Sequence, residues 1–413
     1  MSTTQTIRTI SAAALWTALA SAAMAVEPAQ GPWRGWLDSP GGELPFEMEL
    51  ARADSGWKAW VFNGEQKIDI PQVALHDGKI VLAFTHYDAA IEAEVSEDGR
   101  SLAGVWKKRS SKEIWAELPF RATAGRSPRF APDVKDATGD STTISGKWAV
   151  QFSKSTAPAV GEFHTSPDGA ATGTFMTPMG DYGYLAGRVD GHRLRLSSFD
   201  GSHAFLFDAT LQAGGALAGD FWSRDTWHET WTARRDETAD LPDAFQQTKA
   251  TERADLSALS FRDLDGQTRS LGEFAGKATV IEVFGSWCPN CHDASELLGE
   301  LYTKYSARGL SVVGLAFEIT GEFERDVQQV RRFMERHGGR YPVLIGGVAD
   351  KKVVADSLPM LEEFKAYPTF IFLDGSGRVQ AVYTGFSGPA TGETYHKLRR
   401  QFESLVLRCL GES

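Results

Sequence analysis

Residues 278–291 read Ala-Thr-Val-Ile-Glu-Val-Phe-Gly-Ser-Trp-Cys-Pro-Asn-Cys. The first seven are apolar and β-branched apart from one acid, which predicts a buried strand. Leucines and a tyrosine recur at helical spacing over 295–305, so Cys288 and Cys291 lie where a strand ends and a helix begins. Two cysteines three apart fit on one helical turn, and the positive end of the helix dipole stabilises a thiolate there. This arrangement favours thiol–disulfide exchange, in which one sulfur attacks and the other resolves the mixed disulfide.

Two other uses of the cysteine pair compete with redox chemistry. A zinc site needs about four ligands, but the sequence has no second Cys-x-x-Cys, and its only other cysteine is Cys409. His292 adjoins the pair, with no further histidine nearby in sequence. A purely structural disulfide closing so short a loop would constrain the unfolded chain little. We therefore adopt the redox interpretation and keep zinc and a structural disulfide as its alternatives.

The C-terminal region resembles a known family. From about Leu256 to Leu410 it is similar to the TlpA-type, ResA-like disulfide reductases, within the redoxin group of the AhpC/TSA-like superfamily. Three segments carry the resemblance: the redox motif at 285–291, an apolar strand at 310–316, and Ala-Tyr-Pro-Thr-Phe-Ile-Phe-Leu-Asp at 366–374, which looks like the strand that follows a cis-proline. The resemblance implies a thioredoxin-like domain over 255–413.

The resemblance also implies roles for five residues. Cys288 would be the nucleophile and Cys291 the resolving thiol of a redox-active disulfide. Glu282 occupies the place of the buried acid of thioredoxins, where burial raises a carboxyl pKa toward neutrality so that it can take a proton from the second cysteine; an outward-facing acid is the alternative. Pro368 would follow a cis bond and shape the substrate groove, and Trp287 would cover the site.

Expected partners follow from the same resemblance. The substrates would be protein disulfides, and electrons would come from another dithiol, soluble or membrane-bound, with no diffusible cofactor and no metal. Asp293 and Glu296 add negative charge in the first turns of the helix, and His292 is the only possible cation beside the pair, which favours a reducing potential. Many relatives carry glutamate at the position of Ala294, so no proton-handling role transfers to that position.

Residue patterns outside the motif predict the same domain independently. Apolar runs at 278–284, 310–317, 342–345 and 368–373 alternate with helical patterns at 290–306, 322–337 and 394–408. Such alternation predicts a mostly parallel sheet with helices on both faces. A glycine-rich turn at 375–377 joins 368–373 to 378–383, which predicts an antiparallel hairpin at one edge.

Two further function classes remain open at this stage. A thiol peroxidase resembling peroxiredoxins would carry threonine or serine three residues before its reactive cysteine, where this chain has Gly285. The other class is a binding protein whose N-terminal part holds a ligand while the redox domain is auxiliary. A disulfide-reduction assay against a peroxide-consumption assay separates the first class, and deletion of 26–236 separates the second.

Composition and the N-terminus restrict the setting. The chain has 413 residues, 42% hydrophobic and 23% charged, which suits two or three globular domains. Its net charge of −11 disfavours a nucleic-acid partner, because phosphate backbones require a cationic surface. Arg8, an apolar stretch at 10–23 and Ala23-Met24-Ala25 predict a cleaved signal peptide over 1–25, and hence a periplasmic or otherwise extracytoplasmic protein.

Residues 33–236 contain an internal repeat rich in short alternating runs and glycine turns. Asp77-Gly78 corresponds to Asp190-Gly191, and Leu102-Ala103-Gly104 corresponds to Leu217-Ala218-Gly219. The interpretation pairs Trp36 with Trp148, and Trp115 with Trp231. We expect an antiparallel all-β region of two copies, 26–126 and 140–236, forming two barrels or sandwiches or one fused sheet. The fold class is thus a multidomain α+β chain: an all-β repeat region followed by the α/β domain.

The β region offers no catalytic pattern in sequence. Ten of the 12 tryptophans and six of the nine histidines fall in it, and we interpret them as packing, strand and turn residues, with a ligand-binding cup as the alternative for the tryptophans. A polar stretch at 237–254 is expected to be an exposed linker. Cys409, on the last predicted helix, is expected to be a packed thiol rather than a third redox partner.

Overall fold

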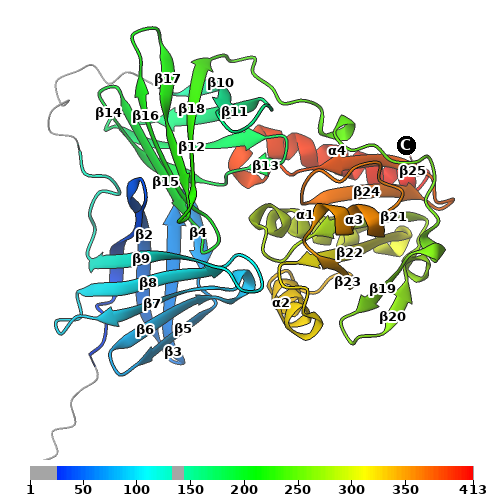
Figure 1. The fold of residues 1–413 in the computed structure, drawn as a ribbon, viewed down its shortest axis with the longest axis horizontal. Coiled ribbons are helices and arrows are strands. Elements are labelled where there is room, and N and C mark those ends of the chain that lie inside the picture. The colour runs from blue at the N-terminus through cyan, green and yellow to red at the C-terminus, as the bar shows by residue number, and fades with distance from the viewer. Residues whose placement is uncertain (1–25, 133–143, 413) are drawn as a thin grey trace, which may run out of the picture.

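The computed structural model describes residues 26–132 and 144–412, which build two all-β units and one α/β domain (Figure 1). The predicted signal peptide lies outside these residues. In Figure 1 the two β units are stacked one above the other, and the α/β domain lies beside both. The expected fold class, an N-terminal antiparallel region followed by a thioredoxin-like domain, is confirmed.

The first β unit is a nine-stranded antiparallel sheet in the order β4-β3-β2-β1-β9-β8-β7-β6-β5. Period-two alternation buries one face of the longer strands; in β9, exposed and buried residues alternate from Trp115 to Thr123. Its strands are β1 (Gly31–Ser39), β2 (Gly42–Ala53), β3 (Gly56–Asn63), β4 (Gln66–Asp69), β5 (Gln72–His76), β6 (Lys79–Phe84), β7 (Ala89–Val95), β8 (Ser101–Arg109) and β9 (Trp115–Ala124), with the short helix η1 (Thr85–Tyr87) between β6 and β7.

The second β unit closes into a barrel. Its order is β11-β10-β18-β17-β16-β15-β14-β12-β13, and an additional β11–β12 pairing joins the two ends. The strands are β10 (Gly146–Phe152), β11 (Ala159–Thr165), β12 (Ala170–Thr177), β13 (Gly180–Asp181), β14 (Leu185–Asp190), β15 (Arg193–Phe199), β16 (Ala204–Leu211), β17 (Ala216–Ser223) and β18 (Trp227–Arg235). Closure removes the exposed edges of the sheet.

The strand register corrects two of the predicted tryptophan pairs. Gly104 and Gly219, which the repeat matches, lie opposite Phe120 and Trp231, so Phe120 is the counterpart of Trp231. Trp115 is instead 39% exposed at the start of β9. The counterpart of Trp148 is Trp33 rather than Trp36.

The indole hydrogen bonds support that second correction. The indole N–H of Trp33 and that of Trp148 each donate to the carbonyl four residues earlier, that of Ala29 and that of Ile144, at 2.9 Å. Both rings are also only 1% exposed. Similarity of residue type misled the sequence comparison, because different aromatic residues fill equivalent core positions.

The C-terminal domain has a seven-stranded sheet in the order β20-β19-β23-β22-β21-β24-β25. The pairs β21–β22 and β22–β23 are parallel, and β24 and β25 form the predicted antiparallel hairpin. The strands are β19 (Ser260–Asp263), β20 (Thr268–Ser270), β21 (Ala278–Phe284), β22 (Leu310–Glu318), β23 (Val343–Val348), β24 (Thr369–Asp374) and β25 (Val379–Thr384). Every residue of β21 is buried, as its apolar sequence predicted.

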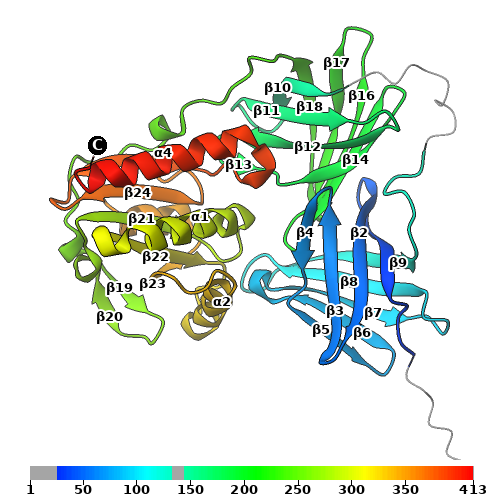
Figure 2. The same cartoon turned by 180° about the vertical axis from the view of Figure 1, so that it is seen from behind.

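Helices cover both faces of this sheet. They are α1 (Pro289–Tyr305), α2 (Phe323–Arg336), α3 (Lys351–Ser357) and α4 (Glu393–Cys409). Side chains of α1, α2 and α4 share one core with Val280 and Phe284, and α1 and α4 run in front of the sheet in Figure 2. Val354 of α3 lies in the core of the opposite face with Ile281 and Val283. The sequence patterns missed β19, β20 and α3, which are short. No described helix is long and apolar enough to cross a membrane.

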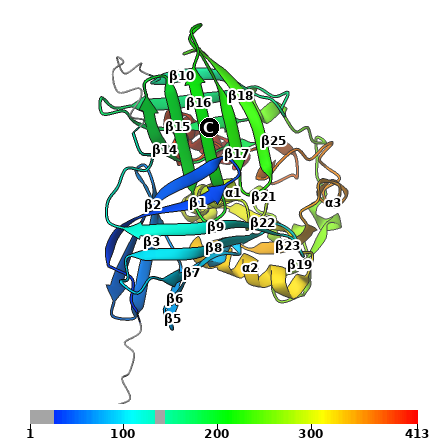
Figure 3. The same ribbon diagram turned by 60° about the vertical axis from the view of Figure 1, so that its left-hand side comes forward.

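The β units pack against the α/β domain through specific contacts, and Figure 3 shows both units in front of it. Gln329 of α2 donates to the carbonyl of Thr85 in the first unit at 2.9 Å, and Lys112 pairs with Glu322 at 2.9 Å. From the second unit, the Asp181 carboxylate accepts from the backbone N–H of Gly388 at 2.6 Å. The two β units therefore both contact the side of the domain that carries the start of α1.

Candidate active site

The two motif cysteines occupy the start of α1. Cys288 is the N-cap residue, Pro289 is the first helical residue, and the N–H of Cys291 donates to the carbonyl of Cys288 at 3.0 Å. A proline suits that first position because its missing N–H would have no helical partner. Cys288 is 8% exposed and Cys291 fully buried, and both are free thiols. Only Cys288 can be reached from outside, and it lies at the positive end of the α1 dipole.

Glu282 lies behind the buried cysteine. It is fully buried in β21, accepting hydrogen bonds from the hydroxyls of Ser295 at 2.9 Å and Tyr341 at 2.8 Å. Burial raises the pKa of Glu282 to about 7. Burial and a hydrogen bond with Cys288 raise the pKa of Cys291 well above its usual value, and the charge of Glu282 adds to this. A protonated thiol therefore neighbours a carboxylate that titrates near neutrality.

A second buried acid supports the motif from the end of β22. Glu318 is fully buried and accepts hydrogen bonds from the N–H of Ser286 at 2.8 Å and from its hydroxyl at 2.7 Å. Burial raises the pKa of Glu318 to about 7. The sequence patterns did not single out this residue, because it follows the apolar run at 310–317, whereas Glu282 lies inside its apolar strand. Glu318 fixes the segment that immediately precedes the cysteines.

Trp287 contacts the residue that precedes Pro368. The Tyr367–Pro368 peptide bond is cis, as the resemblance implied, and Pro368 is buried at the start of β24. The ring of Tyr367 packs edge-on against Trp287 at 5.3 Å, and the indole N–H of Trp287 donates to the carbonyl of Phe317 at 3.0 Å. Trp287 is only partly buried, so it forms a wall beside Cys288.

The second β unit contacts the motif itself. The side-chain amide of Asn290, between the two cysteines, pairs with the backbone of Asp181: its nitrogen donates to the carbonyl and its oxygen accepts from the N–H, both at 3.3 Å. The hydroxyl of Ser202 donates to the carbonyl of Trp287 at 3.4 Å. The β region is therefore part of the environment of the cysteines, which the sequence did not indicate.

Cys288 opens into a pocket of about 320 Å³ between the three units. The α/β domain contributes Trp287, Cys288, Pro289, Asn290, Ile319 and Ala349, and the β units contribute Lys108, Arg109, Ser110, Ser202, His203 and Arg224. Four of the six β-region residues are basic, and no lining residue is acidic. The sequence expectation that His292 is the only cation candidate beside the pair is therefore wrong, because cations distant in sequence reach the site through the fold.

His292 itself carries no positive charge in this setting. It is buried, and burial lowers the pKa of its imidazole well below its usual value. Its two ring nitrogens are in contact with the ring of His337 at 2.8 Å and the carbonyl of Ser286 at 2.9 Å. His86 of the first β unit stacks edge-on against His292 at 5.4 Å between ring centroids. Three neutral histidines thus lie where the first β unit meets α1 and α2.

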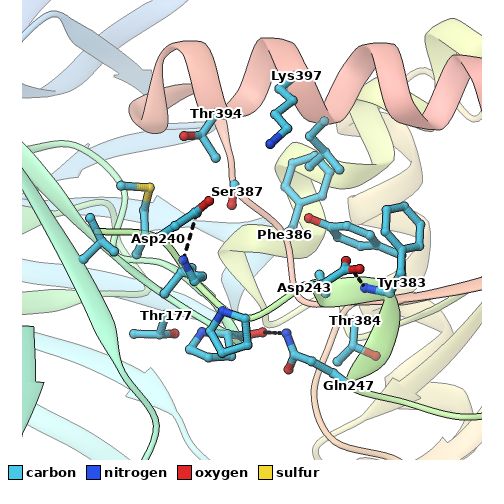
Figure 4. Close-up of a pocket in the computed structure, with 18 of the residues that line it drawn as sticks. Thr177, Asp240, Asp243, Gln247, Tyr383, Thr384, Phe386, Ser387, Thr394 and Lys397 are labelled. Carbon is cyan, nitrogen blue, oxygen red and sulfur yellow. Dashed lines mark hydrogen bonds between the residues drawn. The ribbon is translucent and has the colours of Figure 1, made fainter. Parts of the chain in front are cut away.

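The remaining candidates lie away from the motif. Cys409 is 5% exposed on α4, and burial raises the pKa of its thiol to about 11, which suits a packing role. Among residues 26–132 and 144–412, no cluster of three or more His, Cys, Asp or Glu side chains suits a metal ion. A further pocket of about 380 Å³ lies between the second β unit, the linker and α4, where Gln247 reaches the carbonyl of Pro178 at 3.0 Å (Figure 4). No cysteine lines that pocket.

Comparison with known proteins agrees with this geometry. Residues 244–397 match the Redoxin family model. The C-terminal part of this chain is a redoxin domain. It is 28% identical over 144 residues to the thiol-disulfide oxidoreductase ResA of Halalkalibacterium halodurans, a match that covers 34% of this chain and 74% of the relative.

Two further relatives match the same domain. Identity is 28% over 126 residues with the thioredoxin-like protein YneN of Bacillus subtilis (30% of this chain, 67% of the relative). It is 26% over 117 residues with ResA of Bacillus thuringiensis subsp. konkukian (28% and 60%). This chain therefore spans 60–74% of the length of these three relatives.

Solved structures similar to this chain include two thiol–disulfide proteins. The thiol:disulfide interchange protein of Chlorobium tepidum is 21% identical, with a TM-score of 0.29, covering 42% of this chain and 99% of that one. A secreted thiol-disulfide isomerase of Corynebacterium glutamicum is 19% identical, with a TM-score of 0.31, covering 42% and 97%.

Proposed function

We propose that this protein is an exported thiol–disulfide oxidoreductase that reduces protein disulfides through Cys288 and Cys291. The observation that carries the proposal is the pairing of a pocket-lining cysteine at a helix start with a buried cysteine that neighbours Glu282. The redoxin match and the relatives named thiol-disulfide oxidoreductases support it. The leader-like sequence at 1–25 supports export to the periplasm or another extracytoplasmic space.

The proposed reaction has two exchange steps. The Cys288 thiolate attacks one sulfur of the substrate disulfide; a Cys288–substrate disulfide forms, the substrate S–S bond breaks, and one substrate thiolate leaves and takes a proton. Cys291 then gives its proton to ionised Glu282 and attacks the sulfur of Cys288. The second substrate thiol is released, and the Cys288–Cys291 disulfide remains. Two electrons have passed to the substrate, and a soluble or membrane-bound dithiol donor restores the pair.

Each neighbouring residue has a role in this scheme. Glu282, with a pKa of about 7, is partly ionised at neutral pH and therefore suited to accept the proton of Cys291. Trp287 forms one wall of the pocket that receives the substrate. Pro368, beside Tyr367, borders the proposed substrate groove. No cofactor enters the reaction, since the electrons travel between sulfurs.

Trapping with the Cys291→Ser variant tests the proposal. Without the resolving thiol, the Cys288–substrate disulfide persists and can be identified by mass spectrometry after non-reducing electrophoresis. We expect adducts that disappear on reduction and in the Cys288→Ser/Cys291→Ser double variant. Cys409→Ser in the same background is the matched control and should leave the adducts intact. Absence of adducts, together with no disulfide exchange by the wild-type protein, would contradict the proposal.

A further inference from the structure

We propose that Lys108 and Arg224 of the β units complete the Cys288 pocket as a cationic wall that selects disulfides flanked by negative charge. This inference rests on the proposed function, because it concerns the substrate of the same site. It adds a role for the β region and a chemical class of substrate.

The side chain of Lys108 is buried, which is unusual for a lysine, and its ammonium is held near the motif by a hydrogen bond. Trp106 and Lys108 lie on the same face of β8, and this face points inward: Trp106 is fully buried and Lys108 is 5% exposed. The Lys108 ammonium donates to the hydroxyl of Ser202, and that hydroxyl contacts the carbonyl of Trp287. A chain of contacts therefore runs from the first β unit through the second to the residue preceding Cys288.

The Ser202 loop is itself fixed in place. The carboxylate of Asp200 accepts from the backbone N–H of Ser202 at 2.7 Å and from that of His203 at 2.5 Å. The indole of Trp106 donates to the carbonyl of Gly201 at 3.2 Å. These contacts make the position of Lys108 a property of the folded β units rather than of a mobile side chain.

The charges facing Lys108 leave the pocket positive. Asp88 pairs with Arg109 at 2.6 Å, and Asp200 pairs with His203 at 3.0 Å, so these acids are occupied by the other two basic lining residues. Arg224 lines the same pocket as Lys108, and its charge acts on Lys108.

No carboxylate joins Lys108 or Arg224 along the pocket lining, and these two cations are therefore the ones available to an incoming group.

Burial of Lys108 has an electrostatic consequence. Taking an ammonium out of water is unfavourable unless an anion faces it. Burial and the charge of Arg224 accordingly lower the pKa of Lys108 to about 7, while the charges of Asp200 and Cys288 oppose the decrease. Asp200 lies outside the pocket lining, so the anions that can face Lys108 from within the pocket are the Cys288 thiolate and a carboxylate of the substrate. Opposite charge in such an enclosed site raises local concentration and orients the approaching group.

The shared chemistry is a disulfide with adjacent carboxylates, and it has two sources: a small anionic disulfide or an acidic segment of a protein. Reduced enzyme is therefore assayed with three small probes of different charge: dithiobis-nitrobenzoate (anionic), hydroxyethyl disulfide (neutral) and cystamine (cationic). Two cystine peptides of equal length, one flanked by glutamates and the other by lysines, provide the protein-like arm. Each rate is divided by the rate of the same probe with dithiothreitol, which removes intrinsic reactivity.

We expect the normalised rate of the anionic probe to exceed that of the cationic probe by at least about tenfold, since tenfold corresponds to only about 1.4 kcal/mol. Lys108→Met and Arg224→Gln should each reduce the ratio, Lys108→Arg should retain it, and salt should weaken it. Lys107→Met, next to Lys108 on the other face of β8, is the matched control and should leave the ratio unchanged. Preference for the glutamate-flanked peptide would assign an acidic protein segment, and preference confined to the small probes a small anionic disulfide.

The outcomes separate this inference from the proposed function. Exchange with all probes at equal normalised rates, or a ratio unchanged in both Lys108→Met and Arg224→Gln, overturns the cationic wall and leaves the oxidoreductase intact. Absence of exchange with every probe by the reduced wild-type protein overturns both. Arg224 is half-buried rather than fully buried, so its variant keeps the test informative if Lys108→Met fails to fold.

Discussion

The redoxin domain and the β region meet at Cys288, the first with buried acidic groups and the second with basic ones. The redoxin domain contributes the two cysteines and three acids, Glu282, Glu318 and Asp293, whose pKa values are all raised by burial. The β region contributes basic groups, chiefly Lys108 and Arg224. The sulfur chemistry is therefore local in sequence, whereas the electrostatic setting of the attacking sulfur comes from residues far away in the chain.

The largest expected effect concerns the local half of this comparison. Glu282→Gln keeps the hydrogen-bonding shape of the side chain but removes the proton acceptor, so resolution of the mixed disulfide should slow by about 10²–10⁴-fold while the attack by Cys288 changes little. Single-turnover release of a Cys288-bound probe measures this step. The control is Glu296→Gln, an exposed acid on α1. Equal slowing of attack and resolution would remove the role of Glu282 as base.

The interface between the two halves should be acid-sensitive. Burial lowers the pKa of His86 to about 3 and that of His337 to about 4, against about 6.5 in the unfolded chain. The unfolded state therefore binds protons first, and stability is lost as pH falls from about 6.5 toward those values, by about 1.4 kcal/mol per pH unit for each histidine.

His86→Phe isolates this contribution. Between pH 6.5 and pH 5.0 the variant should lose about 2 kcal/mol less free energy of unfolding than the wild type. His76→Phe is the control, because His76 has a largely exposed side chain. Denaturant unfolding followed at both pH values gives the comparison, and parallel losses in wild type and His86→Phe would show that His86 does not carry the acid sensitivity.

Separating the halves tests them directly. The fragment 255–413 holds every cysteine and Glu282, and it has its own buried core, so we expect it to fold and to exchange disulfides with the neutral probe. Its charge preference should fall by about tenfold because Lys108 and Arg224 are gone. Stopped-flow kinetics of fragment and full chain with the anionic and cationic probes provide the measurement. An insoluble or inactive fragment beside an active full chain would mean that the β region is needed to build the site.

The sequence predicted the part of the site that is contiguous. Cys288, Cys291 and the buried acid Glu282 lie within one strand-turn-helix segment, whose apolar strand and helical spacing are local patterns. The boundaries of the long elements also followed from periodicity: the helical pattern at 290–306 became α1, Pro289–Tyr305. Short elements such as β20 and α3 carry too few residues for a periodic signal.

The basic wall could not be predicted, because nothing in a single sequence places β8 beside α1. One signal was present nonetheless: alternation puts Lys108 on the same inward face as Trp106, and a lysine at an inward position requires a partner. The sequence alone also overstated the charge of the residues that adjoin the cysteine pair. His292 adjoins the pair, yet its burial keeps it neutral, and burial likewise raises the pKa of Asp293 well above its usual value.

The smallest expected effect concerns the redox potential, where the two halves oppose each other. A cation beside Cys288 stabilises the reduced thiolate and makes the disulfide more oxidising. Lys108→Met should therefore shift the potential to a more negative value; a threefold change in the exchange equilibrium corresponds to about 15 mV. Equilibration of full-length protein in redox buffers, followed by alkylation and mass spectrometry, measures the shift, with Lys107→Met as the control.

The reductase direction further requires that the wild-type potential lie nearer to about −270 mV than to about −120 mV. A wild-type potential at the oxidising end, with a large negative shift in Lys108→Met, would show that the β region converts a reductase-type domain into an oxidant. An unchanged potential in Lys108→Met would mean that the charge of Lys108 does not stabilise the Cys288 thiolate.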